Sequence, residues 1–452
     1  MLYTSVRNFP ERAFATMDES NESPRLERVR KSVGANFRRL ALANISAQGI
    51  PLAVSPVLSR LYDPVAFGSF GIFTTITANA AAIATLKFDW LIPNETSASR
   101  ARALLRAGLV TTVATTVIAF LAVLTVPALG SQLPDVVSRA LFVIALLCTA
   151  SIALLSGWWI REGALGVMGF AKFMQAGSTA AIAIAFGLVL GPRGHGLEWA
   201  FVVGLVLACI LMAVPRTEHQ PISEREPIPS ARSVAWGLRH SAAISTGIAM
   251  MNVACGSIPI IVASVVFSAE EAGWVVLAQR VILGPPAVLS AAFANAFWSN
   301  AAALAREAKI IELSTLYRAT TLRLLWISLV PTAACLLAPH LIGPIFGSSQ
   351  WQAAGDVGQA LAPMMLGNVA LAPTNHLVVL GAQRLQLLSD GTRLLLSALI
   401  GIAASWFDVS LTTTIWLLSF ASLIGNAVLF LTHVAVHARA QPRIQLLADA
   451  AK

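Results

Sequence analysis

Arg280 is the residue of this chain whose position most suggests chemistry, because it stands inside an otherwise apolar stretch. It follows Trp274 by six residues, or about 9 Å along a helix. A charged side chain at the centre of a membrane helix costs about 2.5–3.5 kcal/mol and usually faces a cavity or a partner. Because a guanidinium donates paired hydrogen bonds to phosphate oxygens, we predict that Arg280 lines a cavity and binds a diphosphate. Outward snorkelling or a structural pairing is the alternative. Small or polar residues share its helical face: Gly284, Ala287, Ala291 and Asn295.

Other polar side chains recur within the apolar stretches and could line the same cavity. Buried amides can equally serve only to hold helices together. Arg60 stands beside Asp63, with which it could form an ordinary interfacial ion pair. His376 could respond to protons, although a neutral, hydrogen-bonded histidine is the simpler interpretation. No deeply buried carboxylate is apparent. Besides Arg280, the residues that we predict to contact a bound substrate are Gln279, Asn44, Gln48, Asn252, Asn295, Asn368, Asn375 and Arg60.

Two further pairs of residues could guide or gate a ligand. Lys87 and Asp89 lie near the inner end of the second apolar stretch. There we predict either an entry site for a lipid headgroup or an interfacial anchor together with Trp90. Pro285 and Pro286 follow Arg280 and would kink or open its helix, because proline lacks the backbone N–H that a helix uses.

The composition places these side chains in a membrane protein. Hydrophobic residues make up 56% of the 452 residues, charged residues only 12%, and the mean hydropathy is +0.73. Because a soluble domain is about one quarter charged, membrane embedding is the economical interpretation. The four cysteines lie in apolar runs without CxxC spacing, so we predict small core residues rather than metal ligands or disulfides.

Twelve stretches contain the roughly 20 apolar residues that a helix needs to cross a bilayer. The alternation typical of an outer-membrane barrel is missing from them. We therefore predict an all-α polytopic membrane protein with twelve transmembrane helices in two six-helix bundles. The predicted spans are residues 40–59, 65–86, 104–129, 137–159, 164–190, 197–214, 241–267, 272–298, 320–346, 353–381, 385–406 and 411–436.

The distribution of lysine and arginine predicts the orientation. If the N terminus is cytoplasmic and the spans alternate, most of the 31 Lys and Arg residues fall in inner segments, Lys172 among them. Both termini are therefore predicted to be cytoplasmic, and the net charge of +9 is a topology signal rather than a nucleic-acid footprint. Residues 1–38 are predicted to be a disordered tail, and residues 438–452 a second tail.

The chain divides at residues 215–240, whose Pro, Glu and Arg content predicts a cytoplasmic linker between bundles at 39–214 and 241–437. Because each bundle holds an even number of spans, both would enter the membrane in the same direction. SRLYDPVAFGSFGIF at residues 59–73 has a faint echo, SVVFSAEEAGWVVLA, at residues 264–278. Each copy falls at the first outer turn of its half. A parallel pseudo-repeat of this kind is typical of transporters, whose substrate site lies between the halves.

Several stretches also resemble a known family. SRLYDPVAFG resembles the Arg-Leu-x-x-Pro-x-x-(Phe/Tyr)-Gly turn of bacterial polysaccharide flippases, matched here by Arg60, Leu61, Pro64, Phe67 and Gly68. LKFDWLIP, AQRVILGPP and LGAQRLQLLSDGTRLLL are similar to further stretches of that family in the same order. About residues 36–437 are thereby similar to the O-antigen and capsule (Wzx-type) branch of the multidrug/oligosaccharidyl-lipid/polysaccharide exporter superfamily. The long polar N-terminal tail and the Gly-Pro-Pro depart from the family pattern.

The resemblance implies a non-enzymatic flippase, without a cofactor, in the bacterial cytoplasmic membrane. It would move a polyprenyl-diphosphate-linked oligosaccharide by alternating access for O-antigen, capsule or exopolysaccharide biosynthesis. Its partners would be that glycolipid, membrane lipids, a polysaccharide polymerase and chain-length proteins, with no nucleic acid. The alternatives are a multidrug or toxin exporter, a peptidoglycan-precursor flippase, and a non-transporting scaffold or polymerase-type enzyme. An H⁺ or Na⁺ gradient could drive transport, but no residue pattern identifies the ion.

Overall fold

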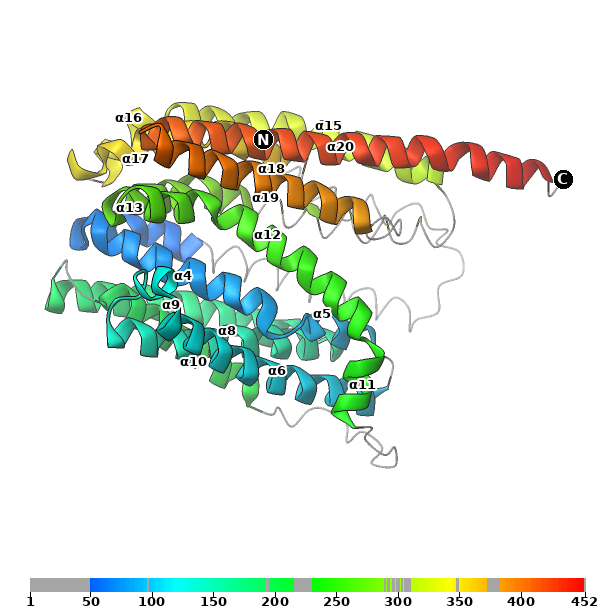
Figure 1. The fold of residues 1–452 in the computed structure, drawn as a ribbon, viewed down its shortest axis with the longest axis horizontal. Coiled ribbons are helices and arrows are strands. Elements are labelled where there is room, and N and C mark those ends of the chain that lie inside the picture. The colour runs from blue at the N-terminus through cyan, green and yellow to red at the C-terminus, as the bar shows by residue number, and fades with distance from the viewer. Residues whose placement is uncertain are drawn as a thin grey trace, which may run out of the picture.

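The computed structural model consists of helices and connecting turns throughout the residues that it describes (Figure 1). The predicted N-terminal tail and most of the predicted linker lie outside the described residues. So do four predicted site residues: Asn44, Gln48, Asn295 and Asn375. The structure describes residues 49–95, 97–191, 195–214, 230–287, 290, 293–294, 297, 301, 304, 310–346, 349–371 and 383–450.

Nine helices of the described part are long and apolar enough to cross a membrane, and a shorter apolar helix covers Gly49–Leu61. The chain is a multi-pass membrane protein, while twelve spans in two bundles remain a prediction. The long helices are α4 (Pro64–Ala84), α6 (Ala98–Thr125), α8 (Val136–Arg161), α9 (Leu165–Leu190), α10 (Gly196–Ala213), α12 (Arg239–Val266), α15 (Ile310–Leu336), α19 (Gln383–Trp406) and α20 (Leu411–Ala450). Shorter elements are α5 (Phe88–Leu91), α7 (Pro127–Gly130), α11 (Ala231–Gly237), α13 (Ala269–Ala278), α16 (Ala338–Phe346), α17 (Gln352–Ala360), α18 (Ala362–Ala370), the 3-10 turns η2 (Ile92–Asn94) and η4 (Ser349–Trp351), and the π-helical turn η3 (Gln279–Leu283).

Prolines divide two of the predicted spans into shorter helices. The ninth predicted span forms α15 and α16, which are separated at Leu337, two residues before Pro339. The tenth forms α17 and α18, which are separated at Leu361, two residues before Pro363. A proline has no N–H for the carbonyl four residues earlier, and it disfavours helical geometry in the residue that precedes it.

The end of the predicted linker contains a short helix, α11. Ser230 caps α11, and its side-chain oxygen accepts a hydrogen bond from the N–H of Ser233 at 3.2 Å. Val234 of α11 packs with Leu104 of α6 and Ala242 of α12. α11 therefore holds the start of the second half of the chain against α6 in the first half.

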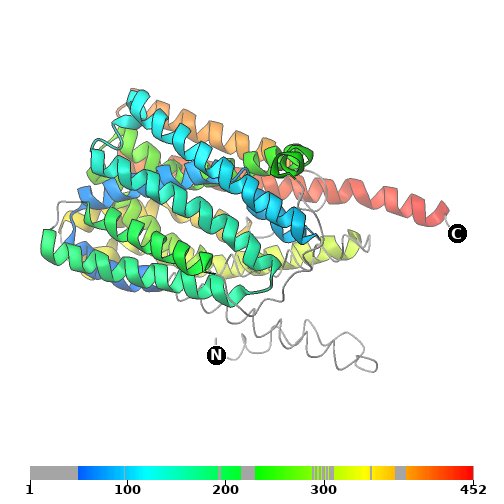
Figure 2. The ribbon, with the colours of Figure 1, turned by 90° about the horizontal axis from the view of Figure 1, so that it is seen from below.

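α20 is much longer than its predicted span. Its apolar part, Leu411–Val436, is long enough to cross a membrane, and residues 437–450 continue the same helix. The C-terminal end of α20 projects beyond the other helices in both views (Figures 1 and 2). The predicted tail therefore begins as a continuation of the last helix.

The helices pack in two groups. α4, α6, α8, α9 and α10 contact one another, and α12, α13 and α15 to α20 form a second set of contacts. Figure 1 shows the first group below the second. α4 joins the groups by packing against both α12 and α13.

The two copies of the sequence repeat contain the starts of α4 and α13, and the two helices begin in the same way. Asp63 caps α4, and its Oδ1 accepts a hydrogen bond from the N–H of Ala66 at 2.8 Å. Ser268 caps α13, and its side-chain oxygen accepts a hydrogen bond from the N–H of Glu271 at 3.2 Å. The shared polar turn of the repeat is thus a pair of helix starts.

α4 and α13 cross through two glycines that occupy equivalent positions in the repeat. A Cβ atom on Gly68 would overlap the carbonyl oxygen of Ala269, the first residue of α13. A Cβ atom on Gly273 would overlap the carbonyl oxygen of Pro64, the first residue of α4. Each glycine therefore admits the start of the other helix, and the two copies run side by side in the same direction from this crossing. The end of the molecule at which they begin is called the crossing end below.

Contacts between the two groups close the crossing end. Trp351 is fully buried, packs edge-on against Phe67 of α4 and donates its indole N–H to the carbonyl oxygen of Ser59 at 2.9 Å. The Ser59 hydroxyl in turn donates to the carbonyl oxygen of Phe346 at 3.2 Å. Arg60 adds a bond from Nη2 to the carbonyl oxygen of Ile345 at 3.2 Å. The end of the helix Gly49–Leu61 is thereby bound to the end of α16.

We expect Gly68→Ala to lower the free energy of unfolding by about 1–3 kcal/mol, because the added methyl group would push α4 and α13 apart. Gly256→Ala on α12 is the matched control, since nothing lies within 4 Å of the Cβ that it would add. Alanine there should leave stability unchanged or raise it by up to about 1 kcal/mol. Equal thermal unfolding midpoints for the two variants in detergent would contradict the close crossing.

Candidate functional site

A cavity of about 360 Å³ lies next to the crossing of α4 and α13. Its walls come from the helix Gly49–Leu61, α4, α9 and α10, and from η3, which follows α13. Most of the lining is apolar, and four polar side chains interrupt it. The lining residues are Pro51, Val54, Leu58, Phe70, Lys172, Gln175, Ala176, Thr179, Ala180, Ala183, Leu197, Phe201 and Arg280.

Arg280 reaches this cavity from a π-helical turn. The turn η3 carries Arg280 and Gln279 and ends just before Gly284. Pro285 and Pro286 follow, and they lack the N–H groups that would bond to carbonyls near the end of η3 in a regular α-helix. Pro285 is exposed and Pro286 half-buried. Arg280 lies about 16 Å along the helix from its start at Ala269, which is about half of the hydrocarbon thickness.

Lys172 supplies a second cation, which the sequence analysis assigned to an inner segment. It lies on α9 within the membrane span, and its side chain lines the cavity. Gln175 and Thr179 follow it on the same face, at the three- and seven-residue spacing of one helical stripe. The sequence contains this stripe of polar residues inside an apolar stretch. Lys172 was nevertheless missed, because counting Lys and Arg residues for membrane orientation assigns every lysine to a loop.

The described lining of the cavity is electropositive, since its charged side chains are Arg280 and Lys172 and none of the described lining residues is acidic. Several buried donors also lack partners among the described residues: Nη1 of Arg280, Nε2 of Gln279 and Oγ1 of Thr179. An unpaired buried donor costs about 1–3 kcal/mol, and more if it is charged. A ligand with anionic oxygen atoms in the cavity would satisfy the donors of Arg280 and Thr179 and would be stabilised by both cations. The predicted contact Gln279 is not among the described lining residues.

The remaining predicted substrate contacts lie elsewhere in the structure. Arg60 is exposed and holds the crossing end together through backbone carbonyls, including that of Pro56 at 2.9 Å. Asn252 is exposed on α12. Asn368 of α18 accepts a hydrogen bond from Asn426 of α20 at 3.3 Å, so it joins two helices of the second group. The cavity lining includes none of these three among its residues.

Lys87 and Asp89 form a turn at the opposite end of α4. Lys87 adopts a left-handed backbone conformation, with φ of 55°, which places its Nζ 3.8 Å from Asp89 and over the Trp90 ring. Asp89 is buried and accepts a hydrogen bond from the Thr85 hydroxyl at 2.6 Å. The two side chains pair because Lys87 precedes the helix that carries Asp89. This geometry matches the interfacial anchor more closely than an open headgroup site.

Buried carboxylates are present, contrary to the sequence prediction. Glu198 of α10 is 5% exposed and Asp89 is 8% exposed. Asp390 of α19 is half-buried, hydrogen-bonds Gln386 and interacts with Arg393. Glu198 was missed at the level of the sequence because it lies at the predicted boundary of its span, where an acidic residue is normally interpreted as part of an exposed helix end.

Comparison with known proteins shows which fold this arrangement of helices is similar to. No family model and no curated protein matches the sequence. Among solved structures, a transporter of the MOP superfamily from Pyrococcus furiosus aligns with a TM-score of 0.60 at 15% identity, covering 90% of this chain and 96% of that one. The chain has the MATE transporter fold. A eukaryotic MATE transporter gives a TM-score of 0.60 at 14% identity over 91% and 100% of the two chains, and an inward-facing multidrug resistance MATE transporter gives 0.54 at 16% over 89% and 95%.

Arg280→Met should keep or raise the stability of this MATE-fold protein, because it removes a buried charge whose Nη1 has no described partner. We expect a gain of up to about 3 kcal/mol in the free energy of unfolding. Arg139→Met is the control, since Arg139 Nε donates to the carbonyl oxygen of Leu133 at 2.8 Å and its loss should cost about 1 kcal/mol. Thermal unfolding in detergent distinguishes the two, and a larger loss in Arg280→Met would show that Arg280 is a structural residue.

Proposed function

We propose that the protein is an alternating-access membrane transporter for an amphipathic anion. The main substrate that we propose is a polyprenyl-diphosphate-linked oligosaccharide. The observation that carries this proposal is the presence of both Arg280 and Lys172 in one cavity whose described lining contains no acidic residue. A diphosphate offers several anionic oxygen atoms to such a pair, and a guanidinium can bind two of them at once.

The fold supports transport. The similar structures are transporters of the MATE family or MOP superfamily, none of them an enzyme by description. The Pyrococcus furiosus transporter is described as having a binding pocket of reverse polarity that suggests a different function. Pocket polarity therefore varies within this fold, and in the present chain the cavity carries positive charge.

The size of the cavity limits what it can enclose. Small-molecule sites are usually about 300–1,000 Å³, so 360 Å³ suits a diphosphate with its nearest sugar but not a whole glycolipid. The prenyl chain would remain in the bilayer, where its burial costs nothing. Moving the remaining sugars requires the two groups of helices to separate, and the α4–α13 crossing is the natural axis for such rocking.

Export of drugs or toxins is the second candidate, and the fold comparisons favour it because a similar structure is a multidrug resistance transporter. A cationic drug in this cavity would face two like charges, which disfavours it. A peptidoglycan-precursor flippase shares the diphosphate headgroup and fits the same cavity. In either flippase role we propose a bacterial cytoplasmic membrane, cytoplasmic termini, and a polymerase and chain-length proteins as partners.

Transport into proteoliposomes tests the proposal, with a fluorescent polyprenyl-diphosphate oligosaccharide as substrate. We expect Arg280→Ala to reduce translocation about 10- to 100-fold, because a charge-assisted hydrogen bond contributes about 1.5–3 kcal/mol. Arg280→Lys should recover only part of the rate, since the fork of donors is lost. Arg318→Ala, which removes an exposed arginine of α15, is the matched control and should transport normally.

The same vesicles distinguish the candidates. Translocation of an undecaprenyl-type peptidoglycan precursor in place of the oligosaccharide would shift the assignment to the other flippase. Export of cationic dyes that is insensitive to Arg280→Ala, without glycolipid movement, would overturn the anionic-substrate proposal in favour of drug export.

A further inference from the structure

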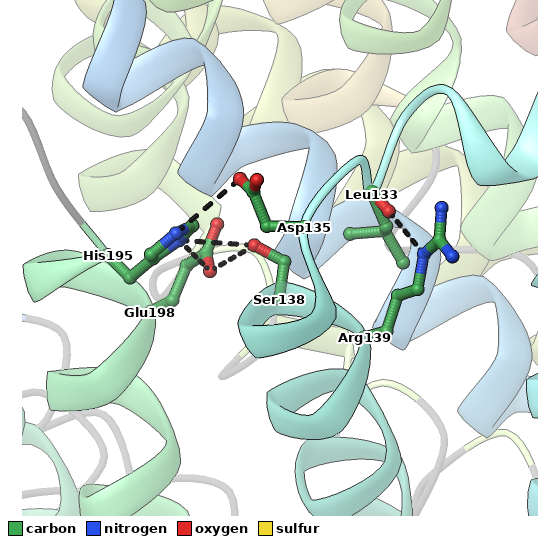
Figure 3. Close-up of polar contacts among 6 residues, drawn as sticks. All are labelled: Leu133, Asp135, Ser138, Arg139, His195 and Glu198. Atoms are coloured by element: carbon green, nitrogen blue, oxygen red, sulfur yellow. Dashed lines mark hydrogen bonds and ion pairs between the residues drawn. The ribbon is translucent and has the colours of Figure 1, made fainter.

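A cluster of ionisable side chains lies at the crossing end, outside the cavity (Figure 3). α8 and α10 both begin there, and each brings an acidic residue with its first turn. Asp135 occupies the N-cap position of α8 and Ser138 follows in the first turn. His195 occupies the N-cap position of α10 and Glu198 follows in the first turn. Helix N-termini stabilise negative charge, which explains why two carboxylates are tolerated at this position.

The hydrogen bonds of the cluster converge on Glu198. Its Oε2 accepts a bond from the Ser138 hydroxyl at 2.8 Å and lies 3.0 Å from Nδ1 of His195. The other ring nitrogen, Nε2, lies 3.5 Å from Oδ2 of Asp135. Figure 3 shows dashed lines from the imidazole to both carboxylates.

Exposure falls along this series of groups. The Asp135 side chain is 60% exposed, that of His195 is 32% exposed, and that of Glu198 is only 6% exposed. Water can therefore reach one end of the series while the other end is buried. This gradient is what a proton needs to pass from solvent to an internal carboxylate.

We propose that His195, Glu198 and Asp135 form a proton-binding site that controls how the first turn of α10 is held at the crossing end. Uptake of one proton from water converts the neutral imidazole to an imidazolium, and no other bond changes. Both ring nitrogens then donate, Nδ1 to Glu198 and Nε2 to Asp135. The charge of the three groups together becomes less negative by one unit, and the ring links α10 to the start of α8.

Loss of the proton has the opposite effect. A neutral ring has one N–H and can donate to only one of the two carboxylates. The other carboxylate then loses the ring N–H that donated to it. The positive charge of the imidazolium, which offset the two negative charges, is also lost. Histidine is the side chain that makes this change between about pH 5 and 8.

Other ionisable groups near the cluster do not replace His195 in this role. Arg139 points away from it in Figure 3 and bonds to the Leu133 carbonyl oxygen. Tyr62, which packs on Gly196, donates its hydroxyl to the carbonyl oxygen of Ala183 of α9 at 2.7 Å. Burial raises the pKa of the Tyr62 phenol to about 12, so it stays protonated. Asp63 of the preceding turn caps α4, and Arg193 lies outside the described residues.

The first turn of α10 connects the cluster to the closed end and to the cavity. Gly196 packs so closely on Tyr62 that an added Cβ would lie 2.6 Å from the phenolic oxygen. Leu197 and Phe201, on either side of Glu198 in the sequence, line the cavity. Protonation therefore favours the closed arrangement seen here, and deprotonation weakens it. This inference holds for any substrate of the cavity.

Proton binding is measured on the full-length protein in detergent by nuclear magnetic resonance of ¹⁵N-labelled histidines, without substrate. His195→Gln identifies the His195 signal. We expect Glu198→Gln to lower the proton affinity of His195 at least about tenfold, because an anionic neighbour at hydrogen-bond distance is lost. The titration of His340, which is exposed on α16, is the internal control and should not move.

Asp135→Asn tests the same site at an exposed position where folding is not at risk, and should lower the affinity by a smaller factor. An unchanged His195 titration in both variants would overturn the proton site. Because no transported substrate is present, this result is independent of whether the protein is a flippase or a drug exporter.

The effect on the closed end is measured through a cysteine introduced at Ala180 in the cavity wall, in a background without the native cysteines. Its rate of maleimide labelling is compared between the otherwise unchanged protein and the His195→Gln variant at each pH, so that thiol reactivity cancels. We expect the ratio of the two rates to change several-fold between about pH 5 and 8. A constant ratio would refute control of the closed end, and the His340→Gln variant should give a constant ratio.

Discussion

The contact between α4 and α13 is the constraint on which the rest of the structure depends. Two backbone segments approach so closely that only glycine fits at Gly68 and Gly273, and each glycine admits the first residue of the other helix. Lipid supplies no hydrophobic force between membrane helices, so such close backbone packing is what holds them together. The crossing aligns the two halves, and the cavity forms beside it because η3 continues from α13.

The cavity and the crossing make opposite contributions to stability. At the crossing, backbone atoms are packed closely and polar groups are capped, as Asp63 and Ser268 show. In the cavity, the guanidinium of Arg280 and the hydroxyl of Thr179 have buried polar atoms that lack described partners. Such unsatisfied groups persist where a ligand completes them, and the surrounding packing compensates for their cost. The prolines after η3 add to this local irregularity without disturbing α4.

Much of the architecture could be predicted from hydropathy, because the requirement for about 20 apolar residues per span is strict. Arg280 could be found for the same reason, since a single charge stands out in an apolar stretch. Lys172 was missed, because a count of lysines for topology assigns it to an inner segment even though Gln175 and Thr179 share its helical face. His195 and Glu198 are three residues apart on α10, but their contacts with Asp135 and Ser138 depend on α8 and α10 beginning side by side, which no local pattern in the sequence records. The twelve-span count and the orientation remain predictions.

The unbroken course of α20 has a consequence for the aqueous side of the membrane. Residues 437–450 extend the helix by about 21 Å beyond its apolar part, farther than one layer of lipid headgroups. This part of α20 therefore forms a helical extension that projects beyond the other helices (Figures 1 and 2). A helical extension of this length would convert a small tilt of the second helix group into a larger displacement at its tip. Anything attached there would report on that tilt.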